Sequence, residues 1–166
     1  EWTRRPEVTW RHSWASAERL AARTWFRDGE VFGQLVDGNT AIKAHGTSIP
    51  VSVELLESDF VPMDLHETGG DTSGPVVMGI EINAWRRPVG YRVYKQHPGE
   101  MMYPAGLGQT KRIPAERMLH LLHSDRIGQL RGVSVFASVI GRIEDLKDLE
   151  ESERIAAKVA ASMAAY

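Results

Sequence analysis

The chain has 166 residues, a length that suits one domain with a hydrophobic core. Hydrophobic residues make up 42% and charged residues 25%, which excludes the disordered and collagen-like classes. The formal net charge is -2, so the chain lacks the basic surplus typical of tight nucleic-acid binding. It contains no cysteine, which excludes disulfides and thiolate metal sites. Its apolar stretches are too short to span a bilayer, and we expect no membrane partner.

An amphipathic helix is predicted near the start of the chain. Trp10, Trp14 and Trp25 recur, with the alanines between them, at spacings that place them on one helical face. Asp28 and Gly29 end the pattern, because glycine tolerates the left-handed conformation that closes a helix. Large aromatic residues at this spacing are more often core than a ligand site. In a piece of a longer protein they could also form an interface.

Five short segments with alternating apolar residues are predicted as strands. They are residues 30–36, 49–56, 76–82, 89–94 and 118–122. The third and fourth form a hairpin with a longer connection, and stretches rich in Gly at 64–75 and 98–108 are predicted as loops.

The last third of the chain is predicted to be helical. Ser134 is the candidate N-cap, and Val139, Ile143 and Leu146 begin an apolar stripe. Polar residues at 150–153 interrupt this stripe, which leaves open whether the helix is continuous. The chain starts without Met and stops inside the helical pattern, so we expect both ends to belong to a longer parent protein.

The order of these elements predicts an α+β fold. It has an N-terminal helix, a mostly antiparallel small sheet and a long C-terminal helical segment. We expect a single domain over residues 1–166, with 134–166 as a helical segment that continues into the parent.

No pattern of residues indicates catalysis or metal binding. His120 and His123 lie three apart at a strand end, where they point to opposite faces, and no G-x-S-x-G motif is present. We therefore predict no catalytic residue, no metal site and no cofactor. One alternative stays open, a small hydrolase-like enzyme that uses Glu54, Asp59 and Glu81 with histidines in a sheet cleft.

Three basic pairs give a second alternative, a weak nucleic-acid-binding module. The pairs are Arg4-Arg5, Arg86-Arg87 and Lys111-Arg112. Solvated turn residues are the default interpretation, because DNA affinity needs several simultaneous charges. The candidate DNA-contacting residues are Arg86, Arg87, Lys111 and Arg112.

A collinear series of short motifs runs along most of the chain. It comprises residues 27–32, 54–59, 79–83, 86–91, 97–98, 113–115, 120 and 126–134. The sharpest part is R-x-G-Q-x-R-G-x-S at 126–134. This series resembles the portal proteins of lambda-type tailed bacteriophages and prophages. One departure is Arg86, where the family often has the glycine of a Gly-Arg-Pro turn.

The residue types of the sharpest motif favour a structural role. Gln129 can bond both an N–H and a C=O group, and Arg126 and Arg131 offer planar forks. Gly132 allows close backbone approach, and Ser134 can cap the long helix. The structural or interface candidates are Arg126, Gln129, Arg131, Gly132, Ser134, Asp28, Gly29, Trp10 and Trp14.

The resemblance implies a structural subunit of a cyclic ring, usually of twelve copies, at one capsid vertex. DNA is packaged and ejected through the channel of such a ring. The implied partners are further copies of the chain, the terminase, capsid and head-completion proteins, and transient double-stranded DNA. The location is the virion, and the host cytoplasm during assembly. ATP chemistry belongs to the terminase. We place this piece in the wing or body of the ring and expect apolar surface on two unlike faces.

Overall fold

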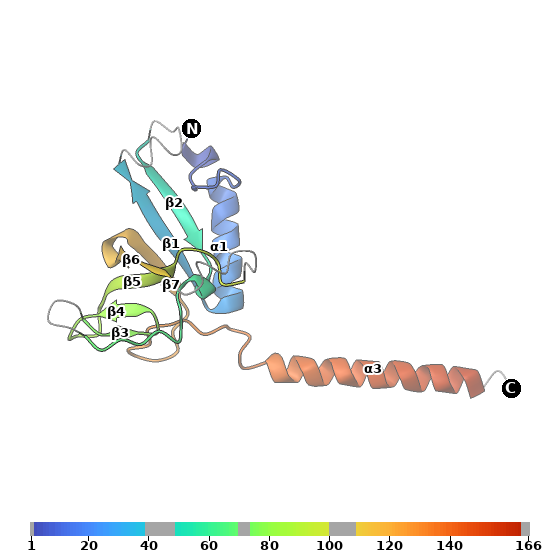
Figure 1. Ribbon diagram of the computed structural model, residues 1–166. Coiled ribbons are helices and arrows are strands. Elements are labelled where there is room, and N and C mark those ends of the chain that lie inside the picture. Colours follow the sequence, from blue (N-terminus) through green and yellow to red (C-terminus); the bar gives the residue numbers. More distant parts are fainter. Residues whose placement is uncertain (1, 39–48, 70–73, 100–108, 164–166) are drawn as a thin grey trace. The chain divides into compact units, whose positions relative to one another are not determined.

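The computed structural model describes residues 2–38, 49–69, 74–99 and 109–163 (Figure 1). The chain forms two compact units, Glu1–Ser134 and Val135–Tyr166. The α-helices and strands are α1 (Trp14–Asp28), β1 (Glu30–Asp37), β2 (Val51–Leu56), β3 (Val76–Val77), β4 (Ile80–Ile82), β5 (Pro88–Tyr94), β6 (Thr110–Pro114), β7 (Met118–Leu122) and α3 (Ile140–Met163). Short 3-10 helices lie at Trp2–Arg4 (η1), Ser58–Phe60 (η2) and Ala115–Arg117 (η4). The predicted α+β class is confirmed.

Helix α1 has a defined cap at each end. The Ser16 N–H donates to Ser13 Oγ at 3.4 Å, which satisfies one of the free amides of the first turn. Gly29 closes the helix with φ +86°, and its N–H donates to the Trp25 carbonyl at 2.9 Å. The predicted helix end is therefore confirmed.

The prediction that Trp10 belongs to this helix is wrong. Trp10 lies before the cap, with φ +60° and the Arg5 guanidinium over its ring. The buried Glu7 carboxylate explains the difference, because it accepts hydrogen bonds from the backbone of Thr9, Arg11 and His12. Such local bonds offer the backbone an alternative to a helical turn.

The strands form two antiparallel sheets where one small sheet was predicted. The first has the order β2-β1-β7 and the second has the order β3-β4-β5-β6. The predicted strand at 76–82 breaks at Met78 and Gly79, which both have positive φ and turn the chain into a short hairpin. Strand β6 was not predicted, because its basic residues Lys111 and Arg112 follow a Gly-rich stretch and are typical of a loop.

The hydrophobic core draws on both sheets. Its buried members are Phe32, Leu56, Val61, Ile80, Ile82, Tyr91, Val93, Ile113, Met118 and Leu130. Side chains alternate along a strand, so Phe32 enters this core while its neighbours Val31 and Gly33 belong to the opposite face, where they line a space together with residues of α1. Helix α1 thus covers the face of the β2-β1-β7 sheet that the core does not use.

Helix α3 is continuous through residues 150–153, where its glutamates are good helix formers. The prediction that Ser134 caps it is wrong, since α3 begins at Ile140. The intervening residues include Val135 and Val139, whose β-branched side chains disfavour a helical start. All described residues of α3 are exposed. Among the helices that the structure describes, none has the length and apolar character needed to cross a membrane.

Candidate functional site

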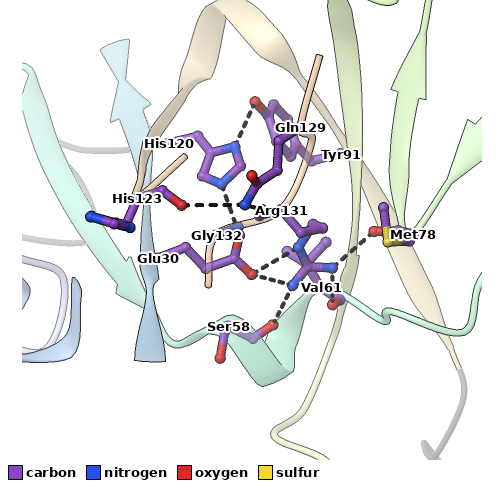
Figure 2. A network of polar contacts seen from close by, with 10 residues as sticks. All are labelled: Glu30, Ser58, Val61, Met78, Tyr91, His120, His123, Gln129, Arg131 and Gly132. Carbon is purple, nitrogen blue, oxygen red and sulfur yellow. Dashed lines mark hydrogen bonds and ion pairs between the residues drawn. The ribbon is translucent and has the colours of Figure 1, made fainter. Parts of the chain in front are cut away.

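A buried ion pair joins two parts of the chain that lie 101 residues apart in sequence (Figure 2). Glu30 is the first residue of β1, immediately after the Gly29 cap, and Arg131 lies in the segment that follows β7. The Arg131 Nε atom donates to Glu30 Oε1 at 2.8 Å, and its Nη2 atom donates to the same oxygen. The side chains are only 1% and 3% exposed, so the pair lies inside the protein and its attraction is little screened.

The guanidinium of Arg131 also binds three backbone carbonyls (Figure 2). Its Nη1 atom donates to the carbonyl oxygens of Val61 and Met78, both at 2.9 Å, and its Nη2 atom donates to that of Ser58 at 3.2 Å. One side chain therefore connects β1, the η2 segment and the β3–β4 turn. A planar fork with five donors suits this task better than the point charge of a lysine would.

The second oxygen of Glu30 accepts two more hydrogen bonds. The Gly132 N–H donates to Oε2 at 2.7 Å, and His120 Nε2 lies 3.1 Å from the same oxygen. The other ring nitrogen, Nδ1, lies 3.4 Å from the Tyr91 hydroxyl (Figure 2). Phe32 stacks on the His120 ring at a centroid distance of 4.2 Å. The network thus reaches from β1 to strands of both sheets.

The electrostatics of the site favour an ionised Glu30. Burial alone would raise the pKa of this carboxyl, because the charged form loses its hydration. The hydrogen bonds from His120, Arg131 and Gly132 and the charge of Arg131 outweigh burial and lower the pKa of Glu30 below 4.5. For Tyr91, burial and the nearby Glu30 charge both raise the pKa.

Two glycines let the backbone cross at this joint. A Cβ atom on Gly132 would lie 2.1 Å from the Gly29 carbonyl oxygen, and one on Gly29 would lie 2.2 Å from the Val133 carbonyl carbon. The same Gly29 carbonyl accepts a hydrogen bond from the His123 N–H at 2.7 Å. No side chain fits between these two backbone segments, so glycine is required at both positions.

Gln129 holds the loop that carries Arg131. The Asp125 N–H donates to Gln129 Oε1 at 3.0 Å, and Gln129 Nε2 donates to the Arg131 carbonyl at 2.8 Å and to the His123 carbonyl at 3.4 Å. The side chain thus bonds both an N–H group and C=O groups, as its residue type predicts. It fixes the loop immediately beside the buried pair.

The chemistry that this network supports is structural. Every polar atom that Glu30 and Arg131 offer is directed at another part of the protein, and neither side chain has a surface for a substrate. Within the ranges that the structure describes, no group of three or more potential metal ligands occurs. A saturated buried pair of this kind specifies how segments fit together, and it offers no group for catalysis.

The carboxylates of the hydrolase alternative have other tasks. Glu54 pairs with Lys111 at 3.4 Å, and Glu81 pairs with Arg112 at 2.6 Å. The hydrogen bond from Arg112 and its charge lower the pKa of Glu81, which is opposite to the shift of a general acid. Asp59 is exposed in η2. These observations speak against a catalytic carboxylate pair.

Comparison with known protein families shows which family the chain belongs to. A family model described as "Phage portal protein, lambda family" matches residues 1–166. The chain belongs to the lambda family of phage portal proteins. A "Probable portal protein" of Halomonas phage phiHAP-1 is 25% identical over 168 residues, which cover 100% of this chain and 31% of that protein. The chain therefore spans about a third of the length of this portal relative.

The remaining candidate residues of this portal segment are exposed or partly buried. Arg126 and its neighbour Ile127 are exposed, and Arg126 contributes its carbonyl oxygen to a hydrogen bond from Ser124. Trp14 is partly buried, lines the space beside α1 and contacts the ring of Trp2 in a tilted arrangement with the ring centroids 5.2 Å apart. Asp28 pairs with the adjacent Arg27 at 2.6 Å.

The candidate DNA-contacting residues separate into two groups. Lys111 and Arg112 lie on β6 and are held by their ion pairs with Glu54 and Glu81. Arg86 and Arg87 are exposed in the β4–β5 turn. In the described part of the chain, neither of them is seen in an ion pair.

The β4–β5 turn explains the departure from the family pattern. The Asn83 Oδ1 atom accepts from the N–H groups of Trp85 and Arg87, and the Arg86 N–H donates to the Asn83 carbonyl. Arg86 has φ +62°, a conformation that glycine adopts without strain. The turn geometry is therefore kept with arginine, at a cost of about 1 kcal/mol or more.

Sequence reasoning missed the roles of Glu30 and Trp85. In the sequence, Glu30 stands out only as part of a motif, although an acid at the start of a buried strand signals a hidden partner. Trp85 is 90% exposed at the tip of the capped turn, and the sequence offers no signal of that exposure.

Proposed function

We propose that this chain is part of a structural subunit of the phage head portal ring, through which DNA is packaged and ejected. Family membership supports this function, because portal proteins are structural and not enzymes. The phiHAP-1 portal relative is about three times as long as this chain, and we assign the ring and its activity to a full-length protein of that kind.

The observation that carries the proposal is the use of the motif at 126–134. Its central arginine, Arg131, donates hydrogen bonds to Glu30 and to three backbone carbonyls. Its glycine, Gly132, lies where two backbone segments approach too closely for a Cβ atom. A catalytic group must be accessible to its substrate, and the side chains of this pair are only 1% and 3% exposed. The pair therefore supports a structural role for the motif.

The proposed partners follow from a ring at one capsid vertex. They are further copies of the chain, twelve in all, together with the terminase, capsid proteins and head-completion proteins. We assign the segment to the wing or body of the subunit, as one domain that continues beyond residue 166. The protein would then be found in the virion, and in the host cytoplasm during assembly.

Contact with DNA in this proposal is weak and rests on Arg86 and Arg87. Both are exposed on a turn whose backbone is fixed by Asn83, whereas Lys111 and Arg112 are engaged in ion pairs. Two positive charges in one subunit release few counterions, so the contact that each subunit makes is weak. The net charge of -2 agrees with a channel that lets DNA slide.

The first test is negative-stain electron microscopy of the full-length protein purified alone. Rings with a central channel are expected. Small discrete particles at every protein and salt concentration would contradict the portal function.

The DNA contact is tested separately with the double variant Arg86→Glu/Arg87→Glu. Rings should form as in the wild type, while the amount of DNA packaged in an assembly assay falls. Lys95→Glu, at an exposed cation immediately after the end of β5, serves as the control and should package normally. Equal packaging by all three proteins would remove Arg86 and Arg87 as contacts.

A further inference from the structure

Two exposed turns of the first unit lie next to each other. The β4–β5 turn spans residues 83–87, and a second turn spans residues 126–129 in the segment after β7. A Cβ atom added to Gly128 would lie 4.0 Å from Arg86 Nε, so the guanidinium of Arg86 passes beside the backbone of the second turn. Two segments that are far apart in the sequence thus meet at one place on the surface.

Hydrogen bonds fix the backbone of both turns. In the first turn, the Asn83 side chain accepts hydrogen bonds from two backbone N–H groups. In the second turn, the Gln129 N–H donates to the Arg126 carbonyl at 3.4 Å, and the φ of +76° at Gly128 is typical of the third residue of a type II turn. Side chains on such turns can bind a partner without a large loss of backbone entropy.

Three arginines are exposed on these turns, Arg86 and Arg87 on the first and Arg126 on the second. Within the ranges that the structure describes, none of their guanidinium groups is seen in an ion pair or a hydrogen bond. The neighbouring acid, Asp125, has its carboxylate 3.5 Å from His123 Nδ1. Even with Asp125 counted, this surface is positively charged, although the net charge of the chain is -2.

Guanidinium groups without internal partners, held on a fixed backbone, suit phosphate groups. Each guanidinium offers planar N–H donors that match two oxygens of one phosphate, and such contacts carry no sequence information. Trp85 is 90% exposed and Ile127 is fully exposed on the same turns. These two side chains offer on the order of 400 Å² of apolar area, about half of what one partner contributes to a stable protein interface. The surface therefore fits the backbone of duplex DNA better than it fits a protein.

We propose that Arg126 contacts DNA phosphates together with Arg86 and Arg87, and that the two turns form one contact surface for double-stranded DNA. This contact rests on the proposed function and extends it to the motif at 126–134. In that motif Arg131 binds other parts of the fold, whereas no internal partner of the Arg126 guanidinium is seen in the described part of the chain. A third charge in each subunit strengthens the contact and leaves it independent of sequence.

The dependence of DNA binding on salt reports how many charges take part in the contact. The full-length protein is assembled into rings, and its binding to a fluorescent duplex of mixed sequence is measured by anisotropy at several salt concentrations. Each arginine that contacts a phosphate adds about 0.9 to the slope of log K against log salt concentration. Arg126→Gln should therefore lower the slope by about 0.9 for each subunit in contact, and Arg86→Gln/Arg87→Gln by about twice as much.

Two control variants separate the loss of charge from a structural effect. Arg126→Lys keeps the positive charge and should retain the wild-type slope, because counterion release depends on charge. Arg23→Gln removes an exposed arginine from α1 and should leave the slope unchanged. Thermal unfolding and ring formation should be the same in all of these variants, since each replaces an exposed side chain.

The possible failures of the proposal are distinguishable. An unchanged slope in Arg126→Gln, with a lower slope in Arg86→Gln/Arg87→Gln, would overturn the role of Arg126 and leave the proposed function standing. Unchanged slopes in both variants, or no binding by wild-type rings at low salt, would contradict the DNA contact as a whole. Absence of rings in the wild type would contradict the portal function itself.

A contact with protein at the same surface is tested with Trp85→Ala/Ile127→Ala. Exposed tryptophan is typical of the side chains that dominate protein interfaces, whereas phosphate contacts depend on charge. The variant should therefore form rings and bind DNA with the wild-type salt dependence. Loss of rings in this variant would show that the two turns contact a neighbouring subunit, and would overturn the proposal.

Discussion

The unit at residues 1–134 and helix α3 use similar residues to opposite effect. In the first unit, Arg131 and Glu30 are buried, and their partners come from segments far apart in the chain. In α3, Arg154 and Glu151 form an exposed pair at 3.6 Å, one turn apart. The first pair is desolvated and must be satisfied completely, while water already satisfies the second. The first unit thus supplies all the partners of its buried pair, whereas every described residue of α3 is exposed.

Removal of the arginine in each region should give the largest contrast. Arg131→Ala leaves the Glu30 charge buried without its partner, so we expect the free energy of unfolding to fall by about 3 to 5 kcal/mol. Arg154→Ala is the matched control and should change it by less than about 0.5 kcal/mol. Urea denaturation of both variants measures the difference. Similar losses from the two substitutions would contradict a special role for the buried pair.

A glycine in each region gives the next contrast. Gly132→Ala would place a Cβ atom 2.1 Å from the Gly29 carbonyl oxygen, and we expect a loss of about 3 kcal/mol because backbone must move. A Cβ atom added to Gly141 in α3 would meet no other atom within 4 Å, so Gly141→Ala should leave stability unchanged or raise it by less than about 1 kcal/mol. Thermal unfolding of both variants is sufficient. Tolerance of alanine at position 132 would mean that the backbone crossing is looser than described.

The buried carboxyl should also make the first unit sensitive to acid. Because the pKa of Glu30 is lowered from 4.5 in the folded state, its ionised form favours folding. This stabilisation is fully present above the unfolded value and is lost as the pH falls through the lower folded value. The pKa values of Glu7 and Glu81 are lowered too, so part of the effect remains in other variants.

The measurement compares the wild type with Glu30→Gln between pH 7 and pH 3. The variant should be less stable at neutral pH, and the difference should begin to shrink below about pH 4.5, where the Glu30 carboxyl of the unfolded chain takes up a proton that the folded protein still excludes. The helical signal of α3 should show no corresponding step. A difference that stays constant over the whole range would mean that ionisation of Glu30 does not stabilise the fold.

Local sequence patterns predicted what local physics determines. The α+β class, the Gly29 cap and strands at β1, β2, β5 and β7 followed from periodicity and glycine chemistry. The failures are also local in cause. The spacing of Trp10 fits the helix. However, the Glu7 carboxylate accepts hydrogen bonds from three backbone N–H groups in the loop before the helix, and the spacing of apolar residues does not reveal these bonds.

The site needed information that spacing along one chain does not contain. The residue types of Arg131 and Gln129 predict that they bind carboxylates, carbonyls and amides, yet the partner Glu30 lies 101 residues away. The carbonyls of Val61 and Met78 have no side-chain signature at all. Similarly, only the fold shows that Lys111 and Arg112 face carboxylates on other strands, which separates them from Arg86 and Arg87.

The smallest expected effect is the most informative about α3. Leu146→Ala removes an exposed side chain, so the free energy of unfolding of the 166-residue chain should change by less than about 0.5 kcal/mol. Leu56→Ala, in the core, should cost about 2 to 5 kcal/mol in the same assay. If Leu146→Ala destabilises the chain alone as much as Leu56→Ala does, then α3 is already packed within its own subunit, and the contrast between the two regions fails.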